Sequence, residues 1–447
     1  MALNNLNPRS QWSSSLSYLI VMIGVVVGLA NVIQFPYLVS QYGGLFVLFY
    51  IIFELIISLP LLFVELSIGR RGKQNPVGAI DILCLESGAS RRWRYLGWLC
   101  FIVSFFTLSY YTVQAAFPLS YFLGSLNIIS LYGPDTPVTV ALHGMSNFLP
   151  IEICFLFFLF ATMLVIARGI NRGLEKISWI CVPMFLFILV ILAVYMAFTG
   201  NFANSLKMLF TSHPGHSIFM VMIAAMGYAF FTLNVGMGCM IVYGSYLPYA
   251  ASFRQSTIII AIVDAVSSLL AYFIIFPLML NSPSFVDHLT NHNVIYLFSG
   301  VKNGFIIAAL FFFAAVIAGW TSTIAMAETA AITMIERFGI TRLRATIILF
   351  IGSALLGTFA ALTHTSWMNV MITDSLPLIG ILRDFTGTIL VPISALGIAI
   401  FAGWVVKKNI FKSELRFSPF IWQCWYFLVK YVAPLLILFL LLSIIFI

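Results

Sequence analysis

Charge is what this sequence most lacks. Only 8% of its 447 residues are Asp, Glu, Lys or Arg, whereas 62% are hydrophobic. A soluble globular domain is about a quarter charged and close to half apolar. The composition, with a mean hydropathy of +1.07, excludes an ordinary soluble protein and indicates a chain that lies in a bilayer.

Several chemical motifs are also missing. The six cysteines and six histidines show no spacing typical of a disulfide framework or a metal site. No Walker loop is present, so nothing in the sequence couples to ATP. His364 and Asp374 are polar residues near a predicted span end, but no nucleophile stands at a recognisable spacing from them. We therefore predict that the chain is not an enzyme.

Long apolar segments recur along the whole chain, and about 20 apolar residues suffice for a helix that crosses a bilayer. We predict an all-α polytopic membrane protein with a single transmembrane domain over residues 1–447. Its eleven predicted spans are residues 16–39, 45–68, 96–126, 149–167, 174–199, 217–243, 254–280, 302–335, 343–362, 381–405 and 418–446.

The loops between these spans predict the orientation. With a cytoplasmic N-terminus, most of the 22 lysines and arginines fall on one face, and only Lys207, Lys302 and Arg383 fall on the other. Such an excess is typical of cytoplasmic loops. The net charge of +8 is therefore an orientation signal rather than a nucleic-acid surface. The absence of an Asn-X-Ser/Thr sequon favours a bacterial inner (cell) membrane, which the chain crosses many times.

Two predicted spans carry helix-breaking sequences at their centres. The first contains Gly28 followed by Asn31, Gln34 and Pro36, and the sixth contains the stretch 227–238 with glycines at its end. Backbone that is not helical survives at membrane depth only beside a cavity or within protein. Close packing of helices is the alternative explanation for any single glycine. Two such breaks, five spans apart, are typical of transporters that bind small solutes at the membrane centre.

A set of short motifs occurs in order along most of the chain. They are GLAN-x3-FPY (28–37), GG (43–44), PLLFVELSIGRRG (60–72), FFTLNVGMG (230–238), YGSY (243–246) and AGWTSTIAMAE (318–328). Together they resemble the neurotransmitter:sodium symporter family, in particular its shorter, eleven-span bacterial members. The resemblance implies the LeuT-type fold, an inverted repeat of five plus five helices in which helices 1 and 6 are unwound at the midplane. The repeats would cover residues 16–199 and 217–405, with an additional helix at 418–446.

The resemblance also implies a function. We expect a sodium-coupled secondary active symporter for a neutral, hydrophobic amino acid, working by alternating access as a monomer or homodimer. Two other functions stay open at this point. One is proton-coupled or differently coupled carriage of another small amine or zwitterion, and the other is a non-transporting substrate sensor.

Two sodium sites follow from the resemblance. The second site would use Gly24, Val27, Ala318, Thr321 and Ser322, and the first would use Val26, Asn31, Thr232 and Asp264. Hydroxyl and carbonyl oxygens suit a hard cation, although hydroxyls in helices also bond to the carbonyl one turn earlier.

Asp264 is the acidic residue well inside its span, where an isolated carboxylate is costly. Because it supplies a negative charge beside the first site, we expect no chloride requirement. A protonated carboxyl that is hydrogen-bonded within the bundle is the alternative for Asp264.

The implied substrate site surrounds the breaks. The substrate carboxylate would meet the N–H groups of Leu29 and Ala30 and the Tyr111 hydroxyl, since a half-helix N-terminus attracts anions. Its ammonium would meet the carbonyls of Val26, Phe231 and Asn234. The side-chain subsite would be formed by Thr107, Phe231, Asn234, Met237, Ser322 and Met326.

The sequence departs from the family pattern near this site. Ala30 replaces a glycine, Val25 replaces a frequently polar residue, and Gln34 replaces the arginine of the outer gate, for which Asp384 is the candidate acidic partner. The inner gate follows the pattern more closely, and its predicted members are Arg9, Trp12, Tyr246 and Glu336.

Overall fold

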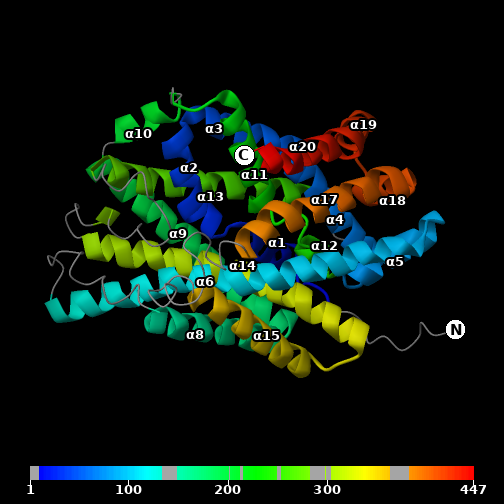
Figure 1. Cartoon of the computed structure of the whole chain (residues 1–447), viewed down its shortest axis with the longest axis horizontal. Coiled ribbons are helices and arrows are strands. Elements are labelled where there is room, and N and C mark those ends of the chain that lie inside the picture. Colours follow the sequence, from blue (N-terminus) through cyan, green and yellow to red (C-terminus); the bar gives the residue numbers. More distant parts are fainter. Residues whose placement is uncertain are drawn as a thin grey trace.

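The structure is a computed structural model that describes residues 10–132, 148–200, 202–211, 215–248, 253–281, 297–298, 304–362 and 382–446. All regular secondary structure in these ranges is helical apart from one isolated bridge residue. Figure 1 shows the helices packed as a bundle, with α6 and α14 running side by side across it.

The first half of the described chain contains elements from α1 to α10, where η marks π- or 3-10 segments. They are α1 (Ser15–Val26), η1 (Ala30–Gln34), α2 (Phe35–Tyr42), α3 (Gly44–Phe53), η2 (Glu54–Ser58), α4 (Leu59–Gly72), α5 (Pro76–Ser87), η3 (Arg91–Trp93), α6 (Arg94–Tyr132), α8 (Phe148–Ala167), η4 (Ile170–Glu175), α9 (Lys176–Thr199) and α10 (Phe202–Met208).

The second half continues in the same manner. Its elements are α11 (Ile218–Thr232), α12 (Cys239–Ser245), α13 (Arg254–Asn281), α14 (Gly304–Phe338), α15 (Arg342–Leu362), η8 (Phe385–Leu390), α17 (Val391–Ile400), η9 (Phe401–Val405), α18 (Lys408–Leu415), α19 (Pro419–Phe427), η10 (Leu428–Val432) and α20 (Ala433–Phe446).

The described helices correspond to the eleven predicted spans. Nine of them are long and apolar enough to cross a membrane. The first predicted span is instead a pair, α1 and η1–α2, bent by 53° at a break of a few residues. The sixth is divided between α11 and the short α12. The two spans with helix-breaking sequences are therefore the two that are interrupted.

Between α11 and α12 the backbone has conformations that few residues adopt. Asn234, Gly236 and Gly238 have φ values of 52°, 88° and 75°. Glycine enters this left-handed region without a steric penalty, and asparagine does so more readily than other residues with a side chain. Three such residues within five positions prevent the helix from continuing, so backbone groups of residues 233–238 need partners elsewhere.

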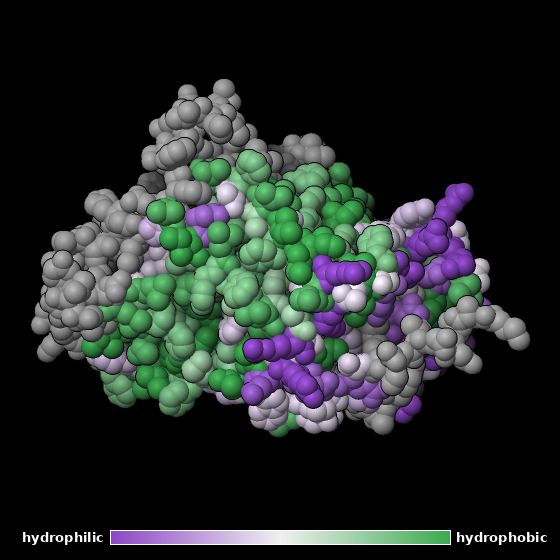
Figure 2. All heavy atoms as spheres, turned by 90° about the horizontal axis from the view of Figure 1, so that it is seen from below, coloured by the Kyte–Doolittle hydropathy of each residue, from purple (hydrophilic) through white to green (hydrophobic). Residues whose placement is uncertain are grey.

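The surface has the polarity expected of an integral membrane protein. Figure 2 shows hydrophobic side chains over the middle of one face and hydrophilic ones gathered toward the end where α5 and α18 lie in Figure 1. Large apolar side chains such as Phe157, Phe187 and Leu355 are more than half exposed. Lys407, Lys408 and other basic residues lie exposed near α18. An apolar surface of this extent needs lipid as its solvent.

Close contact between α4 and α12 generates the first prediction. A Cβ added at Gly69 would lie 1.8 Å from the Ile241 carbonyl oxygen, which is backbone and cannot move aside. We expect Gly69→Ala to destabilise the protein by about 1–3 kcal/mol, the usual range for overpacking. Gly227→Ala is the matched control, because nothing lies within 4 Å of a Cβ there. Thermal unfolding of the detergent-purified protein measures both, and equal stability of the two variants would contradict the packing argument.

Candidate functional site

The candidate site lies where the two interrupted spans meet α6, α13 and α14. The backbone leaves α1 at Val27, which is extended (φ −78°, ψ 100°), and resumes a helical path at η1. Gly28 stands in this gap because a Cβ there would lie 2.7 Å from the Tyr111 hydroxyl and 3.0 Å from Ser322 Oγ. The break therefore approaches α6 and α14 too closely for a side chain.

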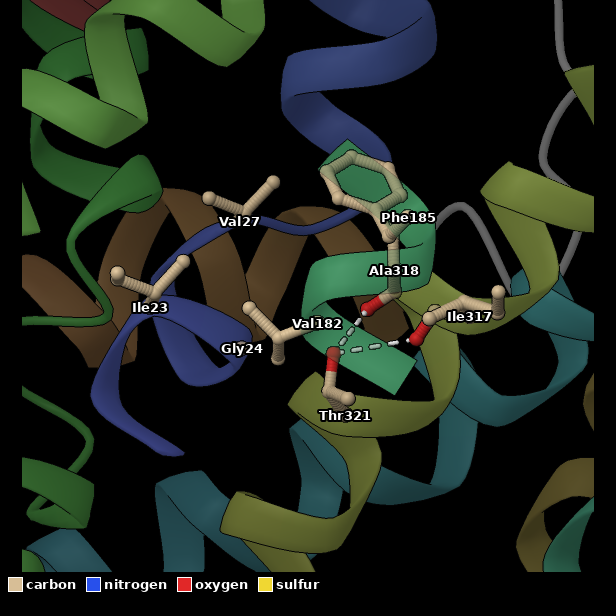
Figure 3. Close-up of a pocket in the computed structure, with 8 residues that line it drawn as sticks. All are labelled: Ile23, Gly24, Val27, Val182, Phe185, Ile317, Ala318 and Thr321. Atoms are coloured by element: carbon tan, nitrogen blue, oxygen red, sulfur yellow. Dashed lines mark hydrogen bonds between the residues drawn. The ribbon is translucent and has the colours of Figure 1, made fainter. Parts of the chain in front are cut away.

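One cavity lies between α1, α9 and α14, as Figure 3 shows. It is narrow, and its lining residues are Ile23, Gly24, Val27, Val182, Phe185, Ile317, Ala318 and Thr321. Four of the five residues predicted for the second sodium site are thus at one cavity. The fifth, Ser322, has its hydroxyl 3.2 Å from the Ala318 carbonyl oxygen.

The two adjacent hydroxyls of this cavity region donate to backbone carbonyls. Thr321 Oγ1 lies 3.1 Å from the Ile317 carbonyl and 3.2 Å from that of Ala318, as the dashed lines in Figure 3 mark. Ser322 Oγ donates to the carbonyls of Ala318 and Val25, both at 3.2 Å. The bonds to Ile317 and Ala318 are those to the preceding turn of the same helix, which the sequence analysis gave as the alternative to sodium binding. These bonds also gather carbonyl and hydroxyl oxygens at one point, and such oxygens are ligands for a hard cation.

A second narrow cavity lies directly between the two breaks. Its lining residues are Val26, Gly28, Ala30, Asn31, Tyr111, Phe231, Thr232, Asn234 and Ser322. The Tyr111 hydroxyl accepts a hydrogen bond of 2.9 Å from the Leu29 N–H. The breaks are also tied together, because Asn234 Nδ2 donates to the Val25 carbonyl at 2.6 Å.

The structure brings most, but not all, of the predicted substrate residues to this cavity. Val26, Ala30, Tyr111, Phe231, Asn234 and Ser322 line it. Leu29 adjoins it through its N–H. Thr107, Met237 and Met326 are buried but are absent from its lining. The Met237 carbonyl instead accepts a bond of 2.6 Å from Ser104 Oγ, which gives one group of the second break a partner.

Asp264, in α13, is fully buried and bonds to Asn31, which lines this cavity. Its Oδ1 accepts from Asn31 Nδ2 at 2.7 Å, and its Oδ2 accepts from the Tyr50 hydroxyl at 3.0 Å. Asn31 Oδ1 in turn accepts from the Gly28 N–H at 2.9 Å. Asn31 thus connects the first break to the carboxylate through two hydrogen bonds. A negative charge on Asp264 therefore acts on the unwound backbone through Asn31.

Several residues of this region were missed by the sequence reasoning. Asn31 Nδ2 also donates to Ser268 Oγ at 2.9 Å, and the hydroxyls of Ser268 and Tyr228 are 3.3 Å apart. Ser268 stands one helical turn from Asp264, a spacing that could have revealed it. Glu65 in α4 accepts a bond of 2.6 Å from the Gly236 N–H, a pairing that no local pattern indicates.

The predicted inner gate is compact in the structure. Trp12 is buried, its N–H donates to the Tyr246 carbonyl at 3.2 Å, and its Nε1 donates to the Tyr243 carbonyl at 3.1 Å. The Tyr246 hydroxyl donates to Glu328 at 2.8 Å, and Arg342 pairs with the same carboxylate at 2.7 Å. From the sequence, Arg342 was interpreted only as one of the basic residues that predict the orientation in the membrane.

The remaining predicted gate residues are Arg9 and Glu336 at the inner end and Gln34 and Asp384 at the outer end. Arg9 lies outside the described residues, and Glu336 accepts from the backbone N–H and side-chain Nδ2 of Asn75 at 2.7 and 2.8 Å. At the opposite end Gln34 is exposed. Asp384 pairs with its neighbour Arg383 at 2.8 Å, with both side chains more than half exposed. No bond between Gln34 and Asp384 occurs in the described structure.

The hydrogen bond at the first break generates the second prediction. Tyr111→Phe removes the acceptor of the Leu29 N–H and leaves a buried donor unpaired, which costs about 1–3 kcal/mol. We expect a matching loss of stability in thermal or denaturant unfolding. Tyr110→Phe is the control, because the Tyr110 hydroxyl has no hydrogen bond to either break in the described structure. A Tyr111→Phe protein as stable as this control would show that the bond does not hold the break.

Comparisons with known proteins bear on what this site does. The family model described as the sodium:neurotransmitter symporter family matches residues 9–131. An uncharacterized sodium-dependent transporter of Haemophilus influenzae is 30% identical over 98% of both chains. A second uncharacterized sodium-dependent transporter, YhdH of Bacillus subtilis, is 28% identical over 97% of both chains.

A solved structure extends the likeness to three dimensions. The crystal structure of MhsT in complex with L-phenylalanine superposes with a TM-score of 0.85. It is 26% identical and covers 98% of this chain and 100% of its own. The fold class predicted from the sequence, an all-α LeuT-type membrane bundle, is confirmed, as is the prediction that the chain is not an enzyme. The Haemophilus influenzae relative is 30% identical over 98% of the chain, and both broken spans are in place. The chain therefore belongs to the sodium:neurotransmitter symporter family and is a sodium-dependent transporter.

Proposed function

We propose that this transporter carries a neutral, hydrophobic amino acid together with sodium by alternating access. The observation that carries the proposal is the cavity between the two breaks. It combines unwound backbone near Val26 and Gly28 with the aromatic ring of Phe231. Backbone polar groups beside an apolar wall suit a zwitterion with an apolar side chain. The similarity to MhsT, whose crystal structure is a complex with L-phenylalanine, supports the same substrate class.

The substrate carboxylate would bind at the start of η1. In the structure the Leu29 N–H is bonded to the Tyr111 hydroxyl, so the carboxylate would take this N–H and then accept from the freed hydroxyl. The Ala30 N–H lies next to it, and together they form an anion site at a helix N-terminus. The ammonium would meet the carbonyls of Val26, Phe231 and Asn234. Thr107, Met237 and Met326, which do not line the cavity, would contribute only through packing behind it.

Ala30 and Gln34 would shape affinity rather than mechanism. Ala30 adds a methyl group to the wall that receives the carboxylate. Gln34 is uncharged and exposed, so an outer gate built on it would close through neutral hydrogen bonds. Such bonds contribute about 1 kcal/mol net, less than those to charged groups. We infer a weaker outer closure than an arginine would provide.

We propose two sodium sites. The second uses the carbonyls of Gly24, Val27 and Ala318 with the hydroxyls of Thr321 and Ser322. The first uses Val26, Asn31, Thr232 and Asp264. The burial of Asp264 beside Asn31 supports the first, because a carboxylate at that depth needs a counter-charge. Since this carboxylate already supplies a fixed negative charge, we propose transport without chloride.

The remaining features of the proposal concern placement in the membrane. We propose a cytoplasmic N-terminus, an inner-membrane location and a monomer or homodimer, with inverted repeats at 16–199 and 217–405 and an additional helix at 418–446. The exposed basic side chains near α18 support this orientation.

The third prediction tests the function and the second sodium site together. Wild-type protein in proteoliposomes should accumulate radiolabelled L-phenylalanine only with an inward sodium gradient. Thr321→Ala with Ser322→Ala should abolish this uptake, because a hard cation then lacks two of its oxygens.

The matched control is Thr329→Ala with Thr333→Ala, which removes two buried hydroxyls that bond to preceding turns of the same helix. It should retain sodium-driven uptake. Wild-type uptake that follows a pH gradient and ignores sodium would favour proton coupling instead. Sodium-dependent binding without any uptake would favour a sensor.

The fourth prediction concerns chloride. Asp264→Asn removes the buried negative charge and keeps a side chain of similar shape. We expect wild-type binding to be equal in sodium chloride and sodium gluconate, and binding by Asp264→Asn to require chloride or to weaken at least tenfold in gluconate. A variant that binds sodium and substrate like wild type in both salts would refute the role of Asp264.

A further inference from the structure

Lys430 is a basic residue inside a membrane span, and the proposed transport mechanism does not use it. It lies at the centre of η10, the π-helical segment between α19 and α20. Figure 1 shows α19 and α20 at the edge of the bundle, and only 28% of the apolar stretch of this span is buried inside the protein. Interruptions of this π type are frequent at functional sites. A charged side chain within a span is costly and needs a partner.

Two π-helical segments in contact, η9 and η10, fix the position of the Lys430 side chain. A Cβ added at Gly403 would lie 2.8 Å from Lys430 Cα, so the two backbones approach closely at a glycine. Trp404 Nε1 donates to the Lys430 carbonyl and the Tyr426 hydroxyl donates to the Gly403 carbonyl, both at 3.0 Å. The ammonium lies 4.7 Å from the centre of the Trp404 ring, 5.4 Å from that of Tyr431 and 5.7 Å from that of Tyr426. These three rings form an aromatic cage, which stabilises the cation without neutralising its charge.

Within the described part of the chain, Lys430 forms no ion pair with a carboxylate. The acidic residues on the elements packed most closely against η10 are Glu54 in η2 and Glu65 in α4. Both are buried, whereas Lys430 is partly exposed, and Glu65 accepts from the Gly236 N–H instead. The surrounding protein therefore provides the ammonium with aromatic rings but not with a counter-charge.

The protein surface beside Lys430 is apolar and exposed. Large side chains between 43% and 66% exposed recur along the span at helical spacing and form one stripe, which consists of Phe427, Tyr431, Leu435, Leu438 and Leu442. Residues three or four positions apart share a helix face, so Lys430 borders the first turn of this stripe. Trp404, which is 60% exposed, stands one residue before Val405, where the preceding span ends. Tryptophans are typical of the membrane–water interface. The ammonium therefore lies close to the membrane surface beside α18, where phospholipid headgroups are found.

Charge complementarity indicates what occupies this surface. We propose that Lys430, positioned by its aromatic cage, binds the headgroup phosphate of an anionic phospholipid in the leaflet beside α18, with the acyl chains along the stripe of residues 427–442. Basic pockets between transmembrane helices are known sites for anionic headgroups. A choline lipid fits this site less well, because the cage that would accept its quaternary ammonium already contains the ammonium of Lys430.

The test measures lipid binding to the purified, delipidated full-length protein in detergent by native mass spectrometry. The probes are phosphatidylglycerol and phosphatidylcholine with the same acyl chains. We expect the wild type to bind its first phosphatidylglycerol about fivefold more tightly than its first phosphatidylcholine, the effect of one lysine at an anionic surface. Equal affinities in the wild type would show a lysine that only extends toward water, and would overturn the proposal whatever the variants do.

Lys430→Gln should remove the preference for phosphatidylglycerol, whereas Lys430→Arg, which keeps the charge, should retain it. Lys408→Gln is the matched control, because it removes the same charge from an exposed position of α18, near the same membrane surface but outside the cage. It should retain the wild-type preference. An unchanged preference in a folded Lys430→Gln protein, or an equal loss in Lys408→Gln, would overturn the assignment to Lys430.

The same spectra report whether a second copy of the chain covers this surface instead of a lipid. A wild-type dimer that dissociates in Lys430→Gln, with no change in lipid preference, would overturn the proposal in favour of a contact between two copies. The measurement contains neither sodium nor an amino acid, so its outcome is independent of the proposed transport function.

Discussion

The structure depends on one constraint: backbone groups that leave a helix at membrane depth must find partners within the protein. Both breaks meet it through long-range contacts. The Leu29 N–H donates to Tyr111, 82 residues away, and the Gly236 N–H donates to Glu65, 171 residues away. Because these partners come from α6 and α4, the breaks exist only in the assembled bundle. Tyr111, the partner of the Leu29 N–H, also lines the cavity between the two breaks.

The hydrogen bonds formed near the two breaks also link the candidate sites to one another. The Val25 carbonyl accepts from Asn234 at 2.6 Å and from Ser322 at 3.2 Å. One backbone oxygen thus connects the first break, the second break and α14, the helix of the proposed second sodium site. A cation that draws Ser322 Oγ toward itself would weaken its bond to Val25 and change the wall of the central cavity. This shared oxygen is a physical route by which the proposed sodium and substrate sites would affect each other.

The sequence predicted those features that depend on local chemistry. Runs of apolar residues located the spans, and the glycines near 28 and 236 located the breaks, because both signals lie within a single segment. Partners contributed by distant segments were not predictable in this way. Glu65 belongs to a motif with no local sign of its bond to Gly236, and Arg342 was indistinguishable from an orientation charge until its contact with Glu328 was visible. The resemblance assigned Thr107, Met237 and Met326 to the substrate subsite, and in the structure they are buried but absent from the lining of the cavity between the breaks.

Electrostatics gives a reason why the proposed cargo and cation would move together. An amino-acid carboxylate at the Leu29 N–H would enter a buried region that already contains Asp264, which reaches the break through Asn31. Two like charges repel by about 4 kcal/mol at 4 Å with an effective dielectric constant of 20, and by less at greater separation. A sodium ion between them turns this repulsion into two attractions. Substrate binding without the cation is then disfavoured, and the cation alone leaves the unwound N–H groups without an anion. Coupling at the first sodium site would then arise from charge balance in a confined, poorly hydrated space.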